Sequence, residues 1–480
     1  MPSLSSLLFQ VFWLQLSLGY PALPEVDVAV VGAGLSGLAA ARKLLEAGKT
    51  VTVFEARDRV GGRVLSKQLK NGGVTELGAA FVGPTQDAVL ALAAELGLET
   101  FKEYNSGDNL AYLGSGRVVF PSTSVIPPLD DVTTSEIGAL IFALDALAAT
   151  VDVEEPWNHP DAARLDSRTL RDAAHEIVTT EDGRDVFEIA VETIWSTQSD
   201  RLSYLYALAY IAGAGNRTTP GTFERLISVD GGGQESRITG GTGLLPNGLA
   251  DKIGRSKILL GNPVQSISKQ ASGKYLVKGS KQSVLARHVV VAMSPPLAER
   301  ITYSPRVSAQ RRTLTRRMFM GSIGKANAVY KTPFWRDARL TGQTISVSDT
   351  IRATYDDSDA AGSYGAILGF VQAAAMEALD NATEAEIQGL VGQDYVRYFG
   401  ARAADVEEWA IFRWDREDYS GGGPTALAGT GTYAKYGTAL KKADGGIHWA
   451  GTEASDYWTG YMDGAIRSGE RTAGDILGGE

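Results

Sequence analysis

The feature that most constrains this chain is a glycine-rich turn between two short apolar runs near its N-terminus. Residues 26–31 (VDVAVV) are typical of a strand buried in a parallel sheet, and the turn GAGLSG at 32–37 follows directly. A helix with one apolar face is expected next, and then a second strand over 51–54 that ends at Glu55. A strand, turn, helix and strand in this order predict a βαβ unit of a Rossmann-type sheet.

Each part of this unit has a physical role in binding a dinucleotide. Gly32 permits the tight turn, Gly34 lets the backbone approach a pyrophosphate, and Gly37 lets the helix pack on the strand. The helix start at Ser36 offers unpaired N–H groups and a positive dipole end to the phosphates. Glu55 is placed to accept hydrogen bonds from ribose hydroxyls and to repel a 2′-phosphate. The unit therefore predicts a dinucleotide other than NADP, without deciding which one.

A second glycine pair follows the acid and indicates the dinucleotide. The run EARDRVGGR at 55–63 gives another close backbone approach and places Arg57 and Arg63 to pair with phosphates. This run resembles the flavin-containing amine oxidase family, which includes monoamine oxidases, polyamine oxidases and L-amino-acid oxidases. The resemblance continues in the same order through residues 76–86, 230–241, 262–267 and 448–465.

The resemblance implies that the cofactor is FAD and implies which residues touch it. In the family, the segment matching 76–86 lays its backbone along the flavin ring, the counterpart of Val264 contacts adenine, and the counterpart of Glu453 binds ribityl hydroxyls. The helix starting near Met462 is expected to direct its N–H groups at the flavin pyrimidine oxygen. The expected cofactor contacts are Gly32, Gly34, Ser36, Gly37, Glu55, Arg57, Gly62, Arg63, Gly78, Ala79, Ala80, Phe81, Val264, Trp414, Tyr419, Gly451, Glu453 and Met462.

Aromatic side chains are expected beside the flavin. Tyr461 resembles one wall of the family's aromatic cage, which orients and desolvates the amine, and we expect it to be catalytic. The other cage tyrosine is replaced by Pro424, so the cage is either half open or completed by another side chain. Trp414 and Tyr419 match family aromatics near the dimethylbenzene edge of the flavin, although packing in the core explains them equally well.

Lys325 is the second residue expected to be catalytic. It lies in a segment resembling the family strand whose lysine holds a water beside flavin N5 and promotes reoxidation by O₂. Alternation within residues 323–329 gives this lysine largely apolar company on its face of the strand. A cation near a reduced anionic flavin also helps electrostatically when O₂ accepts an electron.

Composition narrows the chemistry. The chain has no cysteine, and SGGGP at 420–424 stands where animal monoamine oxidases attach FAD through a cysteine, so non-covalent FAD is expected. The four histidines show no metal-ligand spacing, so no metal is expected and a copper amine oxidase is excluded. A net charge of −10 argues against a nucleic-acid partner, and the arginine pairs at 311–312 and 316–317 are expected on an exposed helix face.

The family pattern predicts an α/β fold with two interleaved domains. The Rossmann-like FAD-binding domain is expected over 25–110, 236–310 and 430–480. The substrate-binding domain, a mixed or antiparallel sheet with helices, is expected over 111–235 and 311–429.

The N-terminus carries a short apolar run. Residues 1–19 are read as a signal peptide, although no lysine or arginine precedes the run, so an apolar helix and a soluble intracellular protein are the alternative. Sequons at Asn216 and Asn381 are compatible with secretion, and no stable membrane anchor is expected. The expected partners are a small-molecule amine and O₂, and a homodimer is left open.

The leading hypothesis is an FAD-dependent amine oxidase that converts a primary amine, O₂ and water to a carbonyl compound, ammonia and H₂O₂. The Gly423-Pro424 variant resembles fungal amine oxidases that act on long aminopolyols such as fumonisins. An L-amino-acid oxidase, which needs an arginine for the substrate carboxylate, and a polyamine oxidase, which needs acids for distant ammonium groups, stay open. An FAD-dependent dehydrogenase or desaturase is a further alternative, which Lys325 and the signature at 458–464 disfavour. A non-catalytic flavoprotein is another, which long insertions or an appended interaction domain would support.

Overall fold

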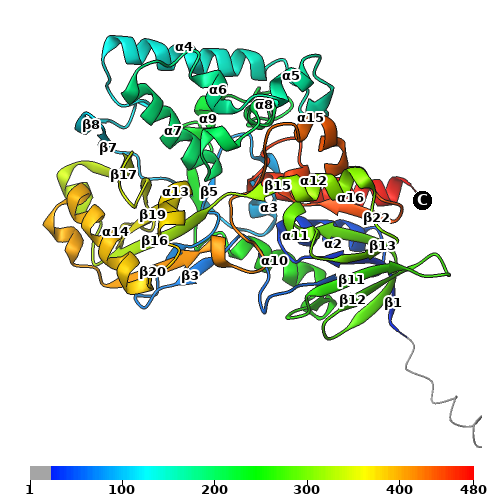
Figure 1. Cartoon of the computed structure of the whole chain (residues 1–480). Helices are drawn as coiled ribbons and strands as arrows, with labels where there is room; N and C mark the ends of the chain where they lie inside the picture. Colours follow the sequence, from blue (N-terminus) through cyan, green and yellow to red (C-terminus); the bar gives the residue numbers. More distant parts are fainter. Residues whose placement is uncertain (1–22, 480) are drawn as a thin grey trace, which may run out of the picture.

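The computed structural model describes residues 23–479, and the signal peptide predicted over 1–19 lies outside them. Two large sheets form the centres of two lobes, and a group of helices lies over them at the top of Figure 1. No helix in residues 23–479 combines the length and the apolar character needed to cross a membrane.

The eight-stranded sheet has the order β10-β2-β1-β13-β12-β11-β14, with β22 also beside β13. Its strands β10, β2, β1, β13 and β22 run parallel, and they are rich in valine because a parallel sheet is buried on both faces. The strands are β1 (Glu25–Val31), β2 (Val51–Phe54), β10 (Ile258–Leu259), β11 (Val264–Lys269), β12 (Tyr275–Gly279), β13 (Ser283–Ala292), β14 (Thr302–Ser304) and β22 (Ile447–Ala450).

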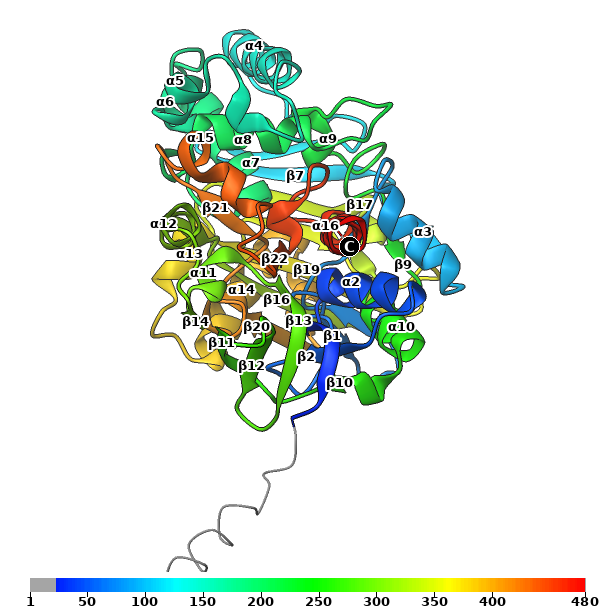
Figure 2. The same cartoon turned by 90° about the vertical axis from the view of Figure 1, so that its right-hand side faces the viewer.

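The helices beside this sheet pack a segment near the N-terminus against one near the C-terminus. Helix α2 (Leu35–Glu46) packs against α16 (Met462–Gly478), as Figure 2 shows. Helix α2 also packs against α10 (Leu244–Ile253), and α16 packs against α3 (Asp87–Glu95). A Cβ at Gly469 of α16 would lie 2.1 Å from the carbonyl oxygen of Ser36, so only glycine permits this approach. The packing brings the 32–37 turn and residues 451–462 to one edge of the sheet.

The seven-stranded sheet has the order β20-β16-β19-β18-β17-β7-β8. Its pairs are antiparallel except for β17 with β7, and its strand β16 is buried along its whole length. The strands are β7 (Asp108–Leu113), β8 (Gly116–Pro121), β16 (Ile323–Tyr330), β17 (Leu340–Ser346), β18 (Ala353–Asp356), β19 (Gly365–Gln372) and β20 (Glu408–Arg413).

Shorter elements fill the space between the sheets, and a helical layer covers the upper part of the molecule. The small sheets contain β3 (Ser66–Gln68), β4 (Val74–Glu76), β5 (Phe81–Val82), β6 (Thr100–Lys102), β9 (Ser236–Ile238), β15 (Met318–Met320) and β21 (Ala426–Ala428). The helices are α4 (Asp131–Ala148), α5 (Ala162–Asp166), α6 (Leu170–Ala174), α7 (Glu181–Trp195), α8 (Tyr204–Ala212), α9 (Phe223–Ile227), α11 (Pro295–Ala298), α12 (Ala309–Arg317), α13 (Ala373–Ala378), α14 (Glu384–Phe399) and α15 (Tyr433–Tyr436).

This architecture is of the predicted α/β class, but one surface expectation is wrong. Arg311 of α12 is buried, not exposed, and its guanidinium lies 3.8 Å from the centre of the Trp449 ring. Its Nη1 donates to the carbonyl of Ala439 at 2.8 Å. Burial lowers the pKa of Arg311 to about 10. The helix turns this face toward β22, whereas Arg316 and Arg317 are exposed as expected.

Candidate active site

A cavity of about 370 Å³ runs from the end of β1 to the face of the seven-stranded sheet. All of the residues expected from the sequence line it, except Gly37 and Glu453. Gly37 instead lies where a Cβ would come within 1.9 Å of the Gly32 carbonyl oxygen, which is the close packing of helix on turn expected of it.

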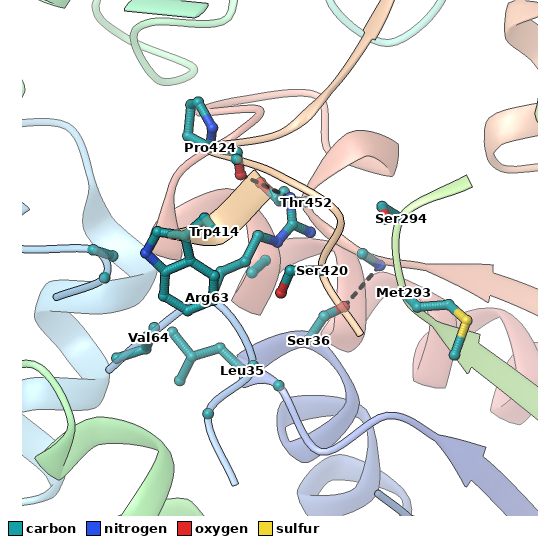
Figure 3. A pocket seen from close by; sticks show the side chains of 18 of the residues that line it. Leu35, Ser36, Arg63, Val64, Met293, Ser294, Trp414, Ser420, Pro424 and Thr452 are labelled. Carbon is teal, nitrogen blue, oxygen red and sulfur yellow. Dashed lines mark hydrogen bonds between the residues drawn. The ribbon is translucent and has the colours of Figure 1, made fainter. Parts of the chain in front are cut away.

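The turn after β1 leaves open space and unpaired donors at one end of this cavity. Gly32 has a φ of +104°, and a Cβ there would lie 2.6 Å from the Ala292 carbonyl oxygen. A Cβ at Gly34 would have no neighbour nearer than 4.0 Å, and α2 starts there without a side-chain cap. The Ser36 hydroxyl accepts from the N–H of Gly451 at 2.9 Å (Figure 3). An open glycine turn before an uncapped helix N-terminus fits the pyrophosphate of a dinucleotide.

Glu55 lies at the end of β2 on the wall of the same cavity and is almost fully buried. Its carboxylate accepts from the N–H of Ala33 at 2.8 Å and from the N–H of Arg57 at 2.9 Å. These two bonds hold the carboxylate beside the glycine turn, where a ribose lies in a Rossmann fold.

The two arginines predicted to pair with phosphates have other partners. Arg57 pairs with Glu417, and Arg63 pairs with Glu453 at 2.8 Å and donates to the Pro424 carbonyl at 2.7 Å. Because each guanidinium already faces a carboxylate, the backbone N–H groups and dipole of α2 are the groups left to meet the phosphate charge. Figure 3 shows Arg63 reaching toward Pro424 across the cavity wall.

Glu453 does not line the cavity but lies next to Arg63, which does, and the contact with ribityl hydroxyls stays a prediction. Its side chain is 2% exposed, and its carboxylate accepts from the N–H of Ala426 at 3.1 Å as well as from Arg63. Burial raises the pKa of Glu453, but the charge of Arg63 together with hydrogen bonds from Arg63 and from main-chain N–H groups holds the pKa below its usual range. The acid therefore fixes Arg63 in the wall.

Lys325 of β16 is fully buried, with its ammonium turned toward the segment that lines the cavity. Its Nζ donates to the carbonyl of Gly78 at 2.5 Å and to that of Glu76 at 3.2 Å, and it lies 5.1 Å from the centre of the Phe370 ring. The surroundings of the Lys325 side chain are more polar than the predicted, largely apolar face. Asn327 on the same face of β16 also donates to the Glu76 carbonyl, at 3.0 Å.

A cluster of buried charges beneath this wall was not predicted. Asp357 pairs with Arg237 at 2.6 Å and accepts from the N–H of Glu76 at 3.1 Å, and Arg237 lies 2.9 Å from Glu103. Burial raises the pKa of Glu103 to about 8, and burial together with Asp357 raises that of Glu76 to about 7. Burial lowers the pKa of Lys325 to about 8, although Asp357 and Glu76 oppose it.

Aromatic side chains line the cavity around Tyr461, which caps the start of α16. Its ring lies 4.8 Å from Trp458 and 6.3 Å from Tyr210, and Tyr210 also lines the cavity. Burial raises the pKa of Tyr461 above its usual value, so the phenol stays neutral. Tyr210 was not predicted, because it lies within the apolar run of α8 and belongs to no recognisable motif.

Trp414 and Tyr419 also line the cavity but differ in burial. Trp414 is buried and donates its indole N–H to the Leu77 carbonyl at 2.7 Å, so it serves both the core and the cavity wall. Tyr419 is 43% exposed, so the alternative that it packs in the core is wrong.

A second cavity of about 240 Å³ meets the first at Thr193, which lines both. Helices α4, α7 and α9 and the 122–127 loop contribute to its walls. The walls carry the carboxylates of Glu224 and Asp230. Its uncharged polar side chains are Asn105, Asn109, Ser122, Thr123, Ser124, Thr193, Ser228, Gln343, Thr344 and Tyr355.

Comparisons with known proteins agree with this geometry. The sequence profile of the family described as "Flavin containing amine oxidoreductase" matches residues 35–477. The chain is similar to a putative flavin-containing monoamine oxidase AofH of Mycobacterium tuberculosis, with 36% identity over 94% of this chain and 96% of that protein. It is also similar to amine oxidase [flavin-containing] B of Sus scrofa, with 33% identity over 94% of this chain and 86% of that protein.

Two solved structures show the same fold. Putrescine oxidase bound to putrescine aligns with a TM-score of 0.88 and 30% identity over 95% of this chain and 99% of the other. Cyclohexylamine oxidase from Brevibacterium oxydans aligns with a TM-score of 0.89 and 31% identity over 95% of this chain and 99% of the other.

Proposed function

From the premise that this chain belongs to the flavin-containing amine oxidoreductase family and is an FAD-dependent amine oxidase, we propose that its substrate is an elongated primary amine with a hydroxylated tail. The products are then a carbonyl compound, ammonia and H₂O₂. The observation that carries this proposal is the second cavity, which meets the first at Thr193 and whose largely apolar wall carries several hydroxyl and amide side chains.

The residues on the first cavity wall fit FAD. The open turn at Gly34 and the N-terminus of α2 suit its pyrophosphate, and Glu55 suits its ribose. When bound, FAD supplies the two-electron acceptor for the amine and passes the electrons on to O₂. Because the chain contains no cysteine, FAD is held without a cysteinyl bond.

The amine end of the cavity favours an uncharged amine, whose nitrogen lone pair is available. Phe81, Ile194, Ile323 and Phe370 line it together with Tyr461. Such walls exclude water and orient the amine, while the ammonium of Lys325, bonded to two carbonyls, provides a fixed positive charge nearby. The cavity wall includes a single carboxylate among the described residues, that of Glu55 at the distant Rossmann end.

The arginines of this wall count against an L-amino-acid substrate. Arg57, Arg63 and Arg300 line the cavity, and each is engaged by the protein itself. The first two pair with glutamates, and Arg300 donates to the main-chain oxygen of Asp418 at 2.6 Å. A substrate carboxylate would therefore have to displace an existing partner of an arginine.

The second cavity supports a hydroxylated tail. Its residues Thr193, Ser228 and Thr344 each have a buried hydroxyl oxygen with no hydrogen-bond partner among the described residues. Buried polar atoms are normally bonded, and a chain of hydroxyl groups both donates and accepts. A tail of this kind matches the aminopolyol class, of which the fumonisins are one example.

A polyamine is the second candidate, and Glu224 and Asp230 favour it. Both carboxylates line the second cavity, where they could face a distal ammonium group. Asp230 already accepts from the side chain of Asn105 at 2.9 Å, so one of the two is partly engaged.

The test compares kcat/KM, in a peroxide-coupled assay, for three amines of matched length: an alkylamine, an aminopolyol and a polyamine. We expect the aminopolyol to be preferred, and Thr344→Val to raise its KM without changing that of the alkylamine. Thr313→Val, whose hydroxyl bonds its own helix at 2.9 Å, is the matched control. Equal values for aminopolyol and alkylamine would refute the proposal, and a preference for the polyamine that Glu224→Gln abolishes would establish the alternative.

A further inference from the structure

Residues 417–424, here termed the strap, cross the cavity between β20 and β21. Tyr419, Ser420, Gly423 and Pro424 of the strap line the cavity. The strap corresponds to the segment that carries the flavin-linking cysteine in animal monoamine oxidases, where this chain has Gly423. Something other than a covalent bond must therefore keep FAD beneath it.

Three arginines hold the strap, two from the run 55–63 and a third, Arg300, from just after α11. Arg57 pairs with Glu417 and donates to the Ser420 hydroxyl at 2.8 Å. Arg300 donates to the main-chain oxygen of Asp418 at 2.6 Å. At the far end of the strap, Arg63 donates to the Pro424 carbonyl at 2.7 Å. All three arginines also line the cavity, so each fastening lies at its rim.

Of the three arginines, Arg57 also contacts Glu55, whose carboxylate is bonded to the glycine turn after β1. The main-chain N–H of Arg57 donates to Glu55 at 2.9 Å, and its guanidinium lies 3.6 Å from the same carboxylate. The guanidinium also lies 5.7 Å from the centre of the Tyr419 ring. The side chains of Arg57 and Glu417 are only 11% and 19% exposed, so solvent screens this pair much less than a surface pair.

We propose that Glu417 is a positioning residue for the cofactor, which acts through Arg57 to hold the strap over bound FAD and so slows its release. Opening the strap requires that the ion pair be broken and both charges be hydrated. Because Arg57 is also bonded to Glu55, the same pair keeps the ribose end of the cavity in place. The proposal rests on FAD occupying this cavity.

The test measures the rate of FAD release from the holoenzyme by the rise in flavin fluorescence after dilution. We expect Glu417→Gln to speed release about tenfold, which corresponds to a loss of about 1.4 kcal/mol. Asp418→Asn is the matched control, since it removes the same charge from the same strap, and the exposed carboxylate of Asp418 has no hydrogen bond or ion pair within residues 23–479.

Two further measurements keep the outcomes separate. Ser420→Ala removes only a neutral partner of Arg57, so it should speed FAD release by less than Glu417→Gln does. If Glu417→Gln fails to fold, the release rate of Ser420→Ala tests the proposal in its place. Release at the wild-type rate from both variants, or equal acceleration by Asp418→Asn, would overturn the proposal. A purified wild-type protein that binds no FAD would instead refute the premise, before any release is measured.

Discussion

Replacing Lys325 with methionine tests the central feature of the site, which is a buried ammonium beside the cavity. The substitution removes one charge from a side chain with two carbonyl partners, at 2.5 and 3.2 Å, and keeps much of its volume. Loss of a fixed donor of this kind typically slows the assisted step roughly 10²–10³-fold. We therefore expect reoxidation of the reduced enzyme by O₂ to slow by that factor, and anaerobic reduction by the amine to change far less.

The pH dependence of the reoxidation rate provides a second, independent estimate of the effect of the Lys325 charge. Burial lowers the pKa of Lys325 to about 8, so about nine tenths of it is charged at pH 7 and about one tenth at pH 9. The charged groups that face it are Asp357, Glu76 and Arg237. Because the ammonium is the helpful form, the wild-type rate should fall nearly tenfold between pH 7 and pH 9. Lys325→Met should lack this fall.

The assay is stopped-flow mixing of anaerobically reduced enzyme with O₂, followed by flavin absorbance across this pH range. Lys331→Met is the matched control, because Lys331 is exposed just beyond the end of the same strand. A reoxidation rate in Lys325→Met equal to that of the wild type, or the same fall with pH in both, would refute the role given to Lys325.

Further predictions use other parts of the molecule. Asp357→Asn removes a charge that raises the pKa of Lys325, so the fall in reoxidation rate should move to lower pH. Acid precipitation should release all of the FAD into the supernatant, and a yellow pellet would contradict non-covalent binding. Gly469→Ala should cost roughly 1–3 kcal/mol of stability, because its Cβ would meet the Ser36 carbonyl oxygen at 2.1 Å, while Gly478→Ala, with nothing within 4 Å, should not. N-terminal sequencing of protein secreted by a eukaryotic host should show that residues 1–19 have been removed.

The parts of the site that could be predicted from the sequence are those whose residues lie close together in the chain. The turn at 32–37 lies between a strand and a helix, and its glycines are needed for backbone reasons that hold in any chain with this geometry. Glu55 could be predicted in the same way, because it directly follows the second strand of the βαβ unit. The Rossmann end of the cavity could therefore be read from about thirty consecutive residues.

The parts that the sequence did not predict depend on pairs far apart in the chain. Arg57 meets Glu417 across 360 positions, so nothing near either residue indicates that its partner is a side chain and not a phosphate. Asp357 and Arg237 are separated by 120 positions. Arg311 was misjudged for a related reason, since an arginine pair in a polar helix does not show which member faces a tryptophan on another element.

The buried charges beneath the wall explain how this fold retains a cation there. An isolated ammonium in a protein interior costs several kcal/mol, and Lys325 would lose its proton without compensation. Two carbonyls and the nearby Asp357 and Glu76 provide that compensation, while Arg237 works against it. Asp357 also bonds the N–H of Glu76, so one carboxylate both fixes the segment that accepts from the lysine and supports its charge. The protonation state of Lys325 is thus set largely by protein groups behind the cavity wall, which are present before any cofactor or amine binds.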